Sequence, residues 1–156
     1  MNKKIATLII SIAIPLGAGI IAGLLTMGGM KDFGSVIQPP LSPPGWIFPI
    51  VWTILYILMG YASYLIYTSD ASEHDIKNAL KYYVAQLAVN FLWSFIFFSL
   101  KWYFTAFIAI LLLWTLIFLT IREFYKINKT AACLLIPYLI WVTFAGYLTA
   151  GITLLN

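Results

Sequence analysis

Five long apolar stretches, almost empty of charged side chains, dominate this 156-residue chain. They run over about residues 5–27, 46–67, 79–100, 102–121 and 131–155, and only Lys81 lies inside one of them, near its end. Each is about as long as the ~20 residues that carry a helix across ~30 Å of hydrocarbon. Lipid offers the backbone no hydrogen-bond partners, and no sustained apolar/polar alternation indicates a β-barrel. The sequence therefore predicts an all-α integral membrane bundle of five transmembrane helices, forming one domain over residues 1–156.

The composition agrees with a membrane protein and excludes other classes. Hydrophobic residues make up 63% of the chain and charged residues 9%, a balance that one soluble core of this size could not hide. The basic residues are scattered over the ends of the stretches and form no stripe with interleaved aromatic residues, so we expect no nucleic-acid partner. Cys133 is the only cysteine, which excludes an intramolecular disulfide and a multi-cysteine metal site.

The distribution of lysine and arginine predicts the orientation. Seven lie on the side of the predicted N-terminus and two on the other side: Lys3, Lys4, Lys77, Lys81, Arg122, Lys126 and Lys129 against Lys31 and Lys101. Because cytoplasmic loops carry the excess of basic residues, we expect a cytoplasmic N-terminus and an outside C-terminus.

The longest connection, residues 28–45, reads GGMKDFGSVIQPPLSPPG. Its paired prolines restrict the backbone, which favours a stiff, extended lid over a passive linker.

Side chains for most kinds of chemistry are missing from the predicted spans. No Asp, Glu, Arg or His lies inside them, which disfavours an ion-driven pump. His74 is the only histidine and lies in a loop, so paired haem ligands cannot form. No serine or threonine has a nearby base to activate it, and we expect neither a metal site nor a standard catalytic activity.

Aromatic and amide side chains share helix faces instead, by i, i+4 spacing. These faces contain Trp52, Tyr56, Gly60 and Tyr64; Gln86, Asn90 and Trp93; and Tyr138, Trp141, Ala145 and Leu148. Packing alone explains such stripes as readily as a ligand pocket does. Asn90, in mid-span, needs a partner in another helix, a water or a ligand. A cavity of rings with a few amides suits a flat, mostly apolar ligand.

The first span carries a small-xxx-small pattern at Ala18, Gly19, Ala22 and Gly23, which lets a neighbouring backbone approach closely. It predicts packing within one bundle or between two copies in a homodimer, and the sequence leaves both open.

Three segments resemble the translocator protein / tryptophan-rich sensory protein family, TspO/MBR. They read QPPLSPPGWIFPIVWTILYILMGYASY from Gln38, AQLAVNFLWSFIFF from Ala85 and PYLIWVTFA from Pro137. The resemblance implies a five-helix protein that binds porphyrins, haem-like tetrapyrroles and benzodiazepine-type ligands in a cavity closed by the first loop. It also implies the plasma membrane of a bacterium as the location, with lipid around the protein and no required cofactor.

The resemblance carries the family's pocket pattern onto this chain. Trp52, Tyr56, Asn90, Trp93, Trp141 and Ala145 match it, Pro43 and Pro44 match the proline pair of the loop, and Gln38, Ile47, Gln86 and Leu148 complete the candidate ligand contacts.

Departures from the pattern put sterol binding in doubt. Leu41 stands where the family commonly has Trp, and Ser42 where animal members have His. A frequently acidic position of the fourth helix is Ala109, and the tail AGYLTAGITLLN has no basic residue to complete the animal cholesterol motif. A formal match at Leu119, Tyr125 and Lys129 is a pattern that arises easily by chance.

We therefore expect a membrane receptor or sensor for such ligands. Two other interpretations stay open: a light-dependent porphyrin-degrading enzyme, with Trp52 and Trp141 as candidate redox-active residues, and a facilitative transporter.

Overall fold

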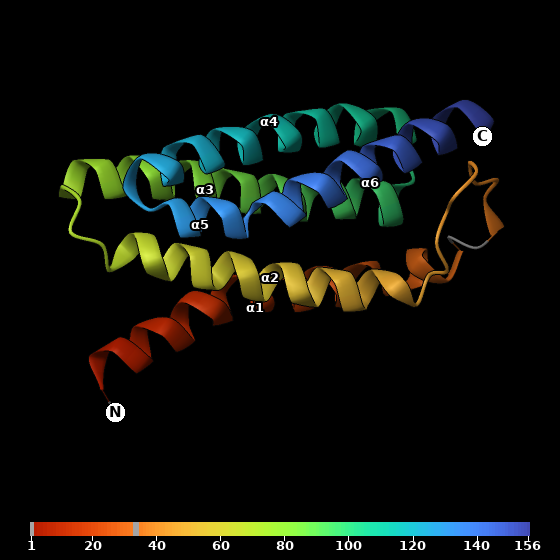
Figure 1. Ribbon diagram of the computed structural model, residues 1–156. Helices are drawn as coiled ribbons and strands as arrows, with labels where there is room; N and C mark the ends of the chain where they lie inside the picture. Colours follow the sequence, from red (N-terminus) through yellow and green to blue (C-terminus); the bar gives the residue numbers. More distant parts are fainter. Residues whose placement is uncertain (1, 33–34) are drawn as a thin grey trace.

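The computed structural model describes residues 2–32 and 35–156, apart from the side chains of residues 30–32 and hence of Lys31. Its helices are α1 (Lys3–Asp32), α2 (Ile47–Tyr67), α3 (Glu73–Ser94), the π-helical segment η2 (Phe95–Leu100), α4 (Tyr103–Ile127), α5 (Lys129–Leu134) and α6 (Ile136–Leu155). In this described part, five helical segments are long and apolar enough to cross a membrane: Lys3–Gly29, Ile47–Tyr67, Glu73–Leu100, Tyr103–Ile127 and Lys129–Leu155. The predicted all-α membrane bundle is confirmed (Figure 1).

Several helices continue beyond the predicted apolar spans, because a helix does not end where the hydrocarbon ends. The α3 helix begins at Glu73 rather than at residue 79, since the Ser72 hydroxyl accepts a hydrogen bond from the Asp75 backbone N–H (3.1 Å) and caps the helix. The α4 helix runs past residue 121 to Ile127, and its largely buried Glu123 carboxylate accepts hydrogen bonds from Asn78 of α3 (3.2 Å) and Lys126 (3.2 Å). The contact from Asn78 joins α3 to α4 at one end of the bundle, while the contact from Lys126 lies within α4.

The predicted loop of residues 28–45 begins later than expected, because α1 continues through Asp32. A glycine pair reads as a helix breaker, yet a Cβ atom on Gly29 would overlap the backbone carbonyl of Phe98. This glycine therefore permits close contact between α1 and η2 instead of ending the helix. Residues 33 and 34 of the predicted loop lie outside the described residues, and the described loop runs from residue 35 to the start of α2.

The fifth predicted span, residues 131–155, is broken at Leu135 into α5 and α6. Pro137 lies in the first turn of α6 and has no N–H to continue the hydrogen bonding of α5, so the break is local to its sequence. Upstream, the Asn128 side chain accepts a hydrogen bond from the Ala131 N–H (3.1 Å) and starts α5 in the polar turn.

Close contacts at glycines hold α1 against α2. A Cβ atom on Gly19 would overlap the Tyr56 ring, and one on Gly60 would meet the Ile12 backbone. The small-residue pattern thus packs inside the bundle at Gly19, whereas a Cβ atom on Gly23 has nothing within 4 Å. Toward its N-terminus α1 diverges from the other helices (Figure 1).

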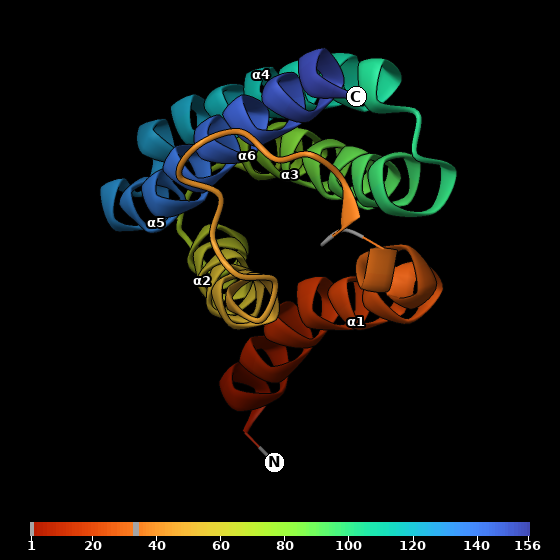
Figure 2. The same cartoon turned by 90° about the vertical axis from the view of Figure 1, so that its right-hand side faces the viewer.

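The loop that leaves α1 crosses one end of the bundle before it enters α2 (Figure 2). It is attached to α6 at two places. The Tyr147 hydroxyl donates to the Pro40 carbonyl (2.7 Å), and the Asn156 amide accepts from the Ile37 N–H (3.1 Å) and donates to the Ile37 carbonyl (2.8 Å). Between them, the Pro39 ring packs where a side chain on Gly151 would lie.

Candidate functional site

A buried polar network joins α2, α3 and α6 in the middle of the bundle. The Tyr138 hydroxyl donates to Gln86 Oε1 (2.6 Å) and accepts from Asn90 Nδ2 (2.7 Å), and the Tyr56 hydroxyl donates to Asn90 Oδ1 (3.3 Å). Gln86 Nε2 lies 4.0 Å from the Met59 sulfur, a weak acceptor. The mid-span amides therefore find their partners in neighbouring helices, because unpaired polar groups are costly there.

Directly beside this network lies a central aromatic pocket of about 20 Å³. Its walls come from α2, α3, η2 and α6, and it is lined by Phe48, Trp52, Trp93, Phe97, Phe98, Trp141, Ala145, Leu148 and Thr149. Trp52 connects pocket and network, with its ring centroid 5.6 Å from that of Tyr56 and 6.1 Å from that of Tyr138. The volume is close to that of a single water, so a larger molecule does not fit unless the lining side chains move.

Helix periodicity explains how these rings converge. Phe48 and Trp52 lie one turn apart on α2, and Trp93 lies one turn before Phe97, with which it stacks at 5.5 Å and 22°. The wider turn of η2 then brings the next residue, Phe98, to the same wall, 6.3 Å from the Trp93 ring.

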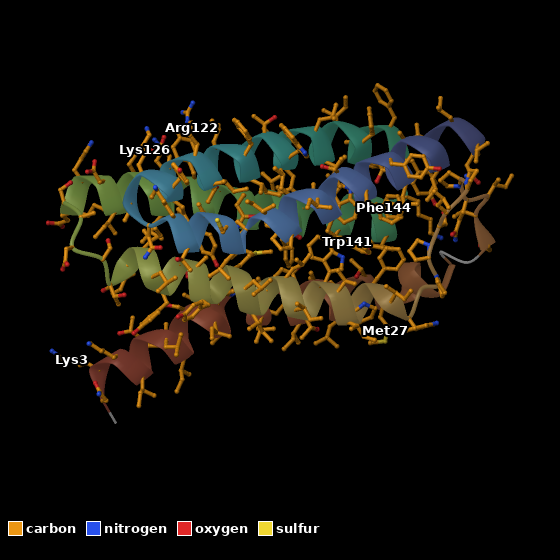
Figure 3. The ribbon with its side chains drawn as sticks, in the orientation of Figure 1. Lys3, Met27, Arg122, Lys126, Trp141 and Phe144 are labelled. Carbon is orange, nitrogen blue, oxygen red and sulfur yellow. The ribbon has the colours of Figure 1, made fainter. Side chains whose placement is uncertain are left out.

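Two buried indole N–H groups at this pocket lack hydrogen-bond partners among the described residues. They are Nε1 of Trp93 and Nε1 of Trp141. Trp141 lies on the side of α6 that faces α2, and its ring contacts Phe48 edge-on at 5.8 Å (Figure 3). A buried donor without an acceptor is costly, so a ligand with acceptor atoms near these N–H groups would gain hydrogen bonds from them.

A second cavity, of about 260 Å³, lies between α1 and α2 and reaches the start of η2. Its lining is Leu16, Gly19, Ile20, Ala22, Gly23, Thr26, Phe48, Pro49, Trp52, Thr53, Tyr56, Ser94 and Phe98.

The structure divides the predicted site residues into three groups. Five line the central pocket: Trp52, Trp93, Trp141, Ala145 and Leu148. Tyr56 lines the cavity between α1 and α2, while Gln86 and Asn90 belong to the polar network. The remaining four line neither cavity and lie in the loop or at the start of α2: Gln38, Pro43, Pro44 and Ile47.

Four lining residues were not predicted: Phe48, Phe97, Phe98 and Thr149. Three of them could have been found by extending each predicted helix face by one turn, that is by four residues. Phe48 lies four residues before Trp52, Phe97 four after Trp93 and Thr149 four after Ala145. Phe98 follows Trp93 by five residues, and only the π-helical geometry places it at the pocket.

Comparison with known proteins places the chain in a family. The TspO/MBR family model matches residues 11–155. The chain is 36% identical to the tryptophan-rich protein TspO of Chlorobaculum tepidum, over 100% of this chain and 99% of that protein. It is 36% identical to the tryptophan-rich sensory protein of Cereibacter sphaeroides, over 72% of this chain and 69% of that protein, and 34% identical to the translocator protein of Bos taurus, over 86% and 81%. The chain therefore belongs to the TspO/MBR family.

Proposed function

We propose that this protein is a membrane receptor or sensor that binds flat, mostly apolar ligands, of the porphyrin or other tetrapyrrole type or drug-like, in the central aromatic pocket. Family membership supports the broader part, a role as a membrane sensor or receptor. The ligand class is inferred from the walls of the pocket: aromatic faces offer stacking area to a flat molecule.

The observation that carries this proposal is the pair of buried indole N–H groups, at Trp93 and Trp141, that have no acceptor among the described residues. Ring nitrogens or carboxylates on a flat ligand supply such acceptors. Gln86 and Asn90 pair with Tyr138, whose ring lies 6.1 Å from that of Trp52 in the pocket wall. The four predicted contacts in the loop and at the start of α2 stay predictions for a ligand-bound state.

Binding of protoporphyrin to the purified protein tests the proposal through Trp93→Phe and Trp141→Phe. Each change keeps an aromatic ring but removes one N–H, so we expect each to weaken binding about fivefold, corresponding to the ~1 kcal/mol of a typical hydrogen bond. Trp114→Phe is the matched control, because the Trp114 N–H donates to Thr143 (2.9 Å) away from the pocket. Unchanged affinity in both pocket variants, with saturable binding in the wild type, places the ligand elsewhere.

A second candidate function is light-dependent degradation of the bound porphyrin. It is favoured by the contacts of Trp52, whose ring lies 5.6 Å from Tyr56, 6.4 Å from Trp93 and 6.1 Å from Tyr138. An indole beside a photoexcited porphyrin can donate an electron, and neighbouring rings can share the resulting charge. At protoporphyrin concentrations that saturate each variant, Trp52→Phe and Trp141→Phe should then slow or abolish the light-dependent decrease of protoporphyrin absorbance in air. Facilitative transport, the third interpretation, is tested by ligand flux into sealed vesicles.

A further inference from the structure

Three aromatic side chains, Phe48, Trp52 and Phe98, line both the central pocket and the cavity between α1 and α2. They form the partition between the central pocket of about 20 Å³ and the cavity of about 260 Å³ between α1 and α2. Ligand pockets for molecules of drug size measure about 300–1,000 Å³. Neither cavity reaches that size alone, so a ligand in the central pocket requires lining side chains to move, and movement of the three shared rings would join the two volumes.

The larger cavity opens on a surface that the bilayer covers. Its rim includes Ile20, which is 62% exposed, and Pro49 and Thr53, which are also exposed. All three lie within helical segments that are long and apolar enough to span the membrane. The mouth of the cavity therefore lies on the outer surface of two helices that are suited to span the membrane.

We infer that the cavity between α1 and α2 is a lateral entrance from the bilayer, and that Phe48, Trp52 and Phe98 are the gate between it and the central pocket. This inference rests on the proposed function, since it names the route by which the apolar ligand reaches its site. A ligand of that class partitions into the membrane, where it meets the mouth of the cavity without crossing water.

The lining of the entrance suits the passage of an apolar molecule. Its threonine and serine hydroxyls are bonded within their own helices: Thr26 to the Ala22 carbonyl and Thr53 to the Pro49 carbonyl, both at 2.7 Å, and Ser94 to the Asn90 carbonyl at 3.2 Å. The Tyr56 hydroxyl donates to Asn90 of α3 (3.3 Å). These four hydroxyl groups therefore have acceptors inside the protein and do not depend on a ligand for one.

Gly23 offers a way to obstruct the entrance alone. A Cβ atom on Gly23 meets nothing within 4 Å, and Gly23 lines the entrance but not the central pocket. Gly17 on the same helix is equally open and lines neither cavity. Gly23→Leu therefore adds a leucine side chain to α1 inside the entrance, and Gly17→Leu adds the same side chain to α1 outside it.

Stopped-flow quenching of tryptophan fluorescence by protoporphyrin, with protein in phosphatidylcholine vesicles, measures both rates. For Gly23→Leu we expect association and dissociation to slow together by about tenfold, which corresponds to about 1.4 kcal/mol of barrier, with equilibrium affinity unchanged. Gly17→Leu should keep the wild-type rates. Thr53→Phe obstructs the entrance from α2 and should reproduce the effect, which guards against a folding defect particular to one variant.

Two other results overturn the proposed entrance, and a third overturns the proposed function instead. Wild-type rates in both Gly23→Leu and Thr53→Phe, with binding intact, place the entrance elsewhere. Weaker affinity with unchanged dissociation makes the cavity part of the bound site and overturns its role as a path. If protoporphyrin does not bind the wild-type protein saturably, it is the proposed function that fails.

Discussion

At the scale of single residues, the Tyr138 hydroxyl determines how the middle of the bundle is held. It is almost completely buried and joins α6 to α3 through hydrogen bonds with the side-chain amides of Gln86 and Asn90. Asn90 in turn accepts a hydrogen bond from Tyr56 of α2. Interhelical hydrogen bonds in membranes contribute modestly one by one, but a donor left unpaired in the core is costly. The network therefore specifies the arrangement of three helices around the pocket.

Replacing Asn90 tests whether its amide serves the fold or the ligand. Asn90→Leu removes the bonds to Tyr56 and Tyr138, so we expect a loss of about 1–2 kcal/mol in the free energy of unfolding. Protoporphyrin affinity should change less than twofold in the folded fraction. Thermal unfolding in detergent and equilibrium binding measure the two effects.

Thr120→Ala is the control for this change, because the buried Thr120 hydroxyl bonds only to the Leu116 carbonyl of its own helix (2.7 Å). Its Tm should stay close to that of the wild type. An Asn90→Leu protein with an unchanged Tm and much weaker binding indicates that the amide contacts the ligand directly.

At the scale of elements, the loop of residues 35–46 owes its position to side chains of α6. Asn156 makes two hydrogen bonds to the backbone of Ile37, and Tyr147 makes one to Pro40. The proline pairs stiffen the segment but line neither cavity. The hydrogen bonds to α6 therefore hold the loop across the end of the bundle, which the stiffness of its prolines alone does not do.

Asn156→Ala tests whether this loop acts as a lid. Loss of two hydrogen bonds of ~1 kcal/mol each favours opening of the loop. An open loop exposes the end of the bundle that it covers, so we expect protoporphyrin to dissociate roughly tenfold faster or more. Thr153→Ala is the control, since the Thr153 hydroxyl bonds to Thr149 within α6 (2.7 Å). Identical dissociation rates in wild type and Asn156→Ala make the loop a connector.

The helices also show which structural features can be predicted from the sequence. Apolar length predicts the five spans because hydrocarbon thickness fixes it, and i, i+4 spacing predicts the faces of α2, α3 and α6. Helix ends escape prediction, since Ser72 capping and the continuation of α1 past Gly29 depend on local contacts. The π-helical turn that brings Phe98 to the pocket has no periodic signature in the sequence.

At the scale of the whole molecule, most of the basic residues and the long loop lie at opposite ends. Lys3, Arg122 and Lys126 lie at one end of the bundle, and the loop of residues 35–46 and the C-terminus lie at the other (Figure 3). Trp46 and Trp102, both strongly exposed, precede α2 and α4 at the loop end, where indoles favour the membrane interface. The partners of the amides, by contrast, could not be predicted, because Asn90 and Tyr138 are 48 residues apart and only packing joins them.

The segregation of basic residues predicts a cytoplasmic end at Lys3, Arg122 and Lys126. A cysteine introduced by Ser72→Cys should therefore react with an impermeant maleimide only from the cytoplasmic side, and one introduced by Ser35→Cys only from outside. Both serines are exposed, and Cys133, also exposed, is first replaced by serine to remove background labelling. In detergent both positions should label fully, which checks that each thiol is reactive. If intact cells show the reverse labelling pattern, the predicted orientation is wrong. The loop and its attachment to α6 then lie on the cytoplasmic side.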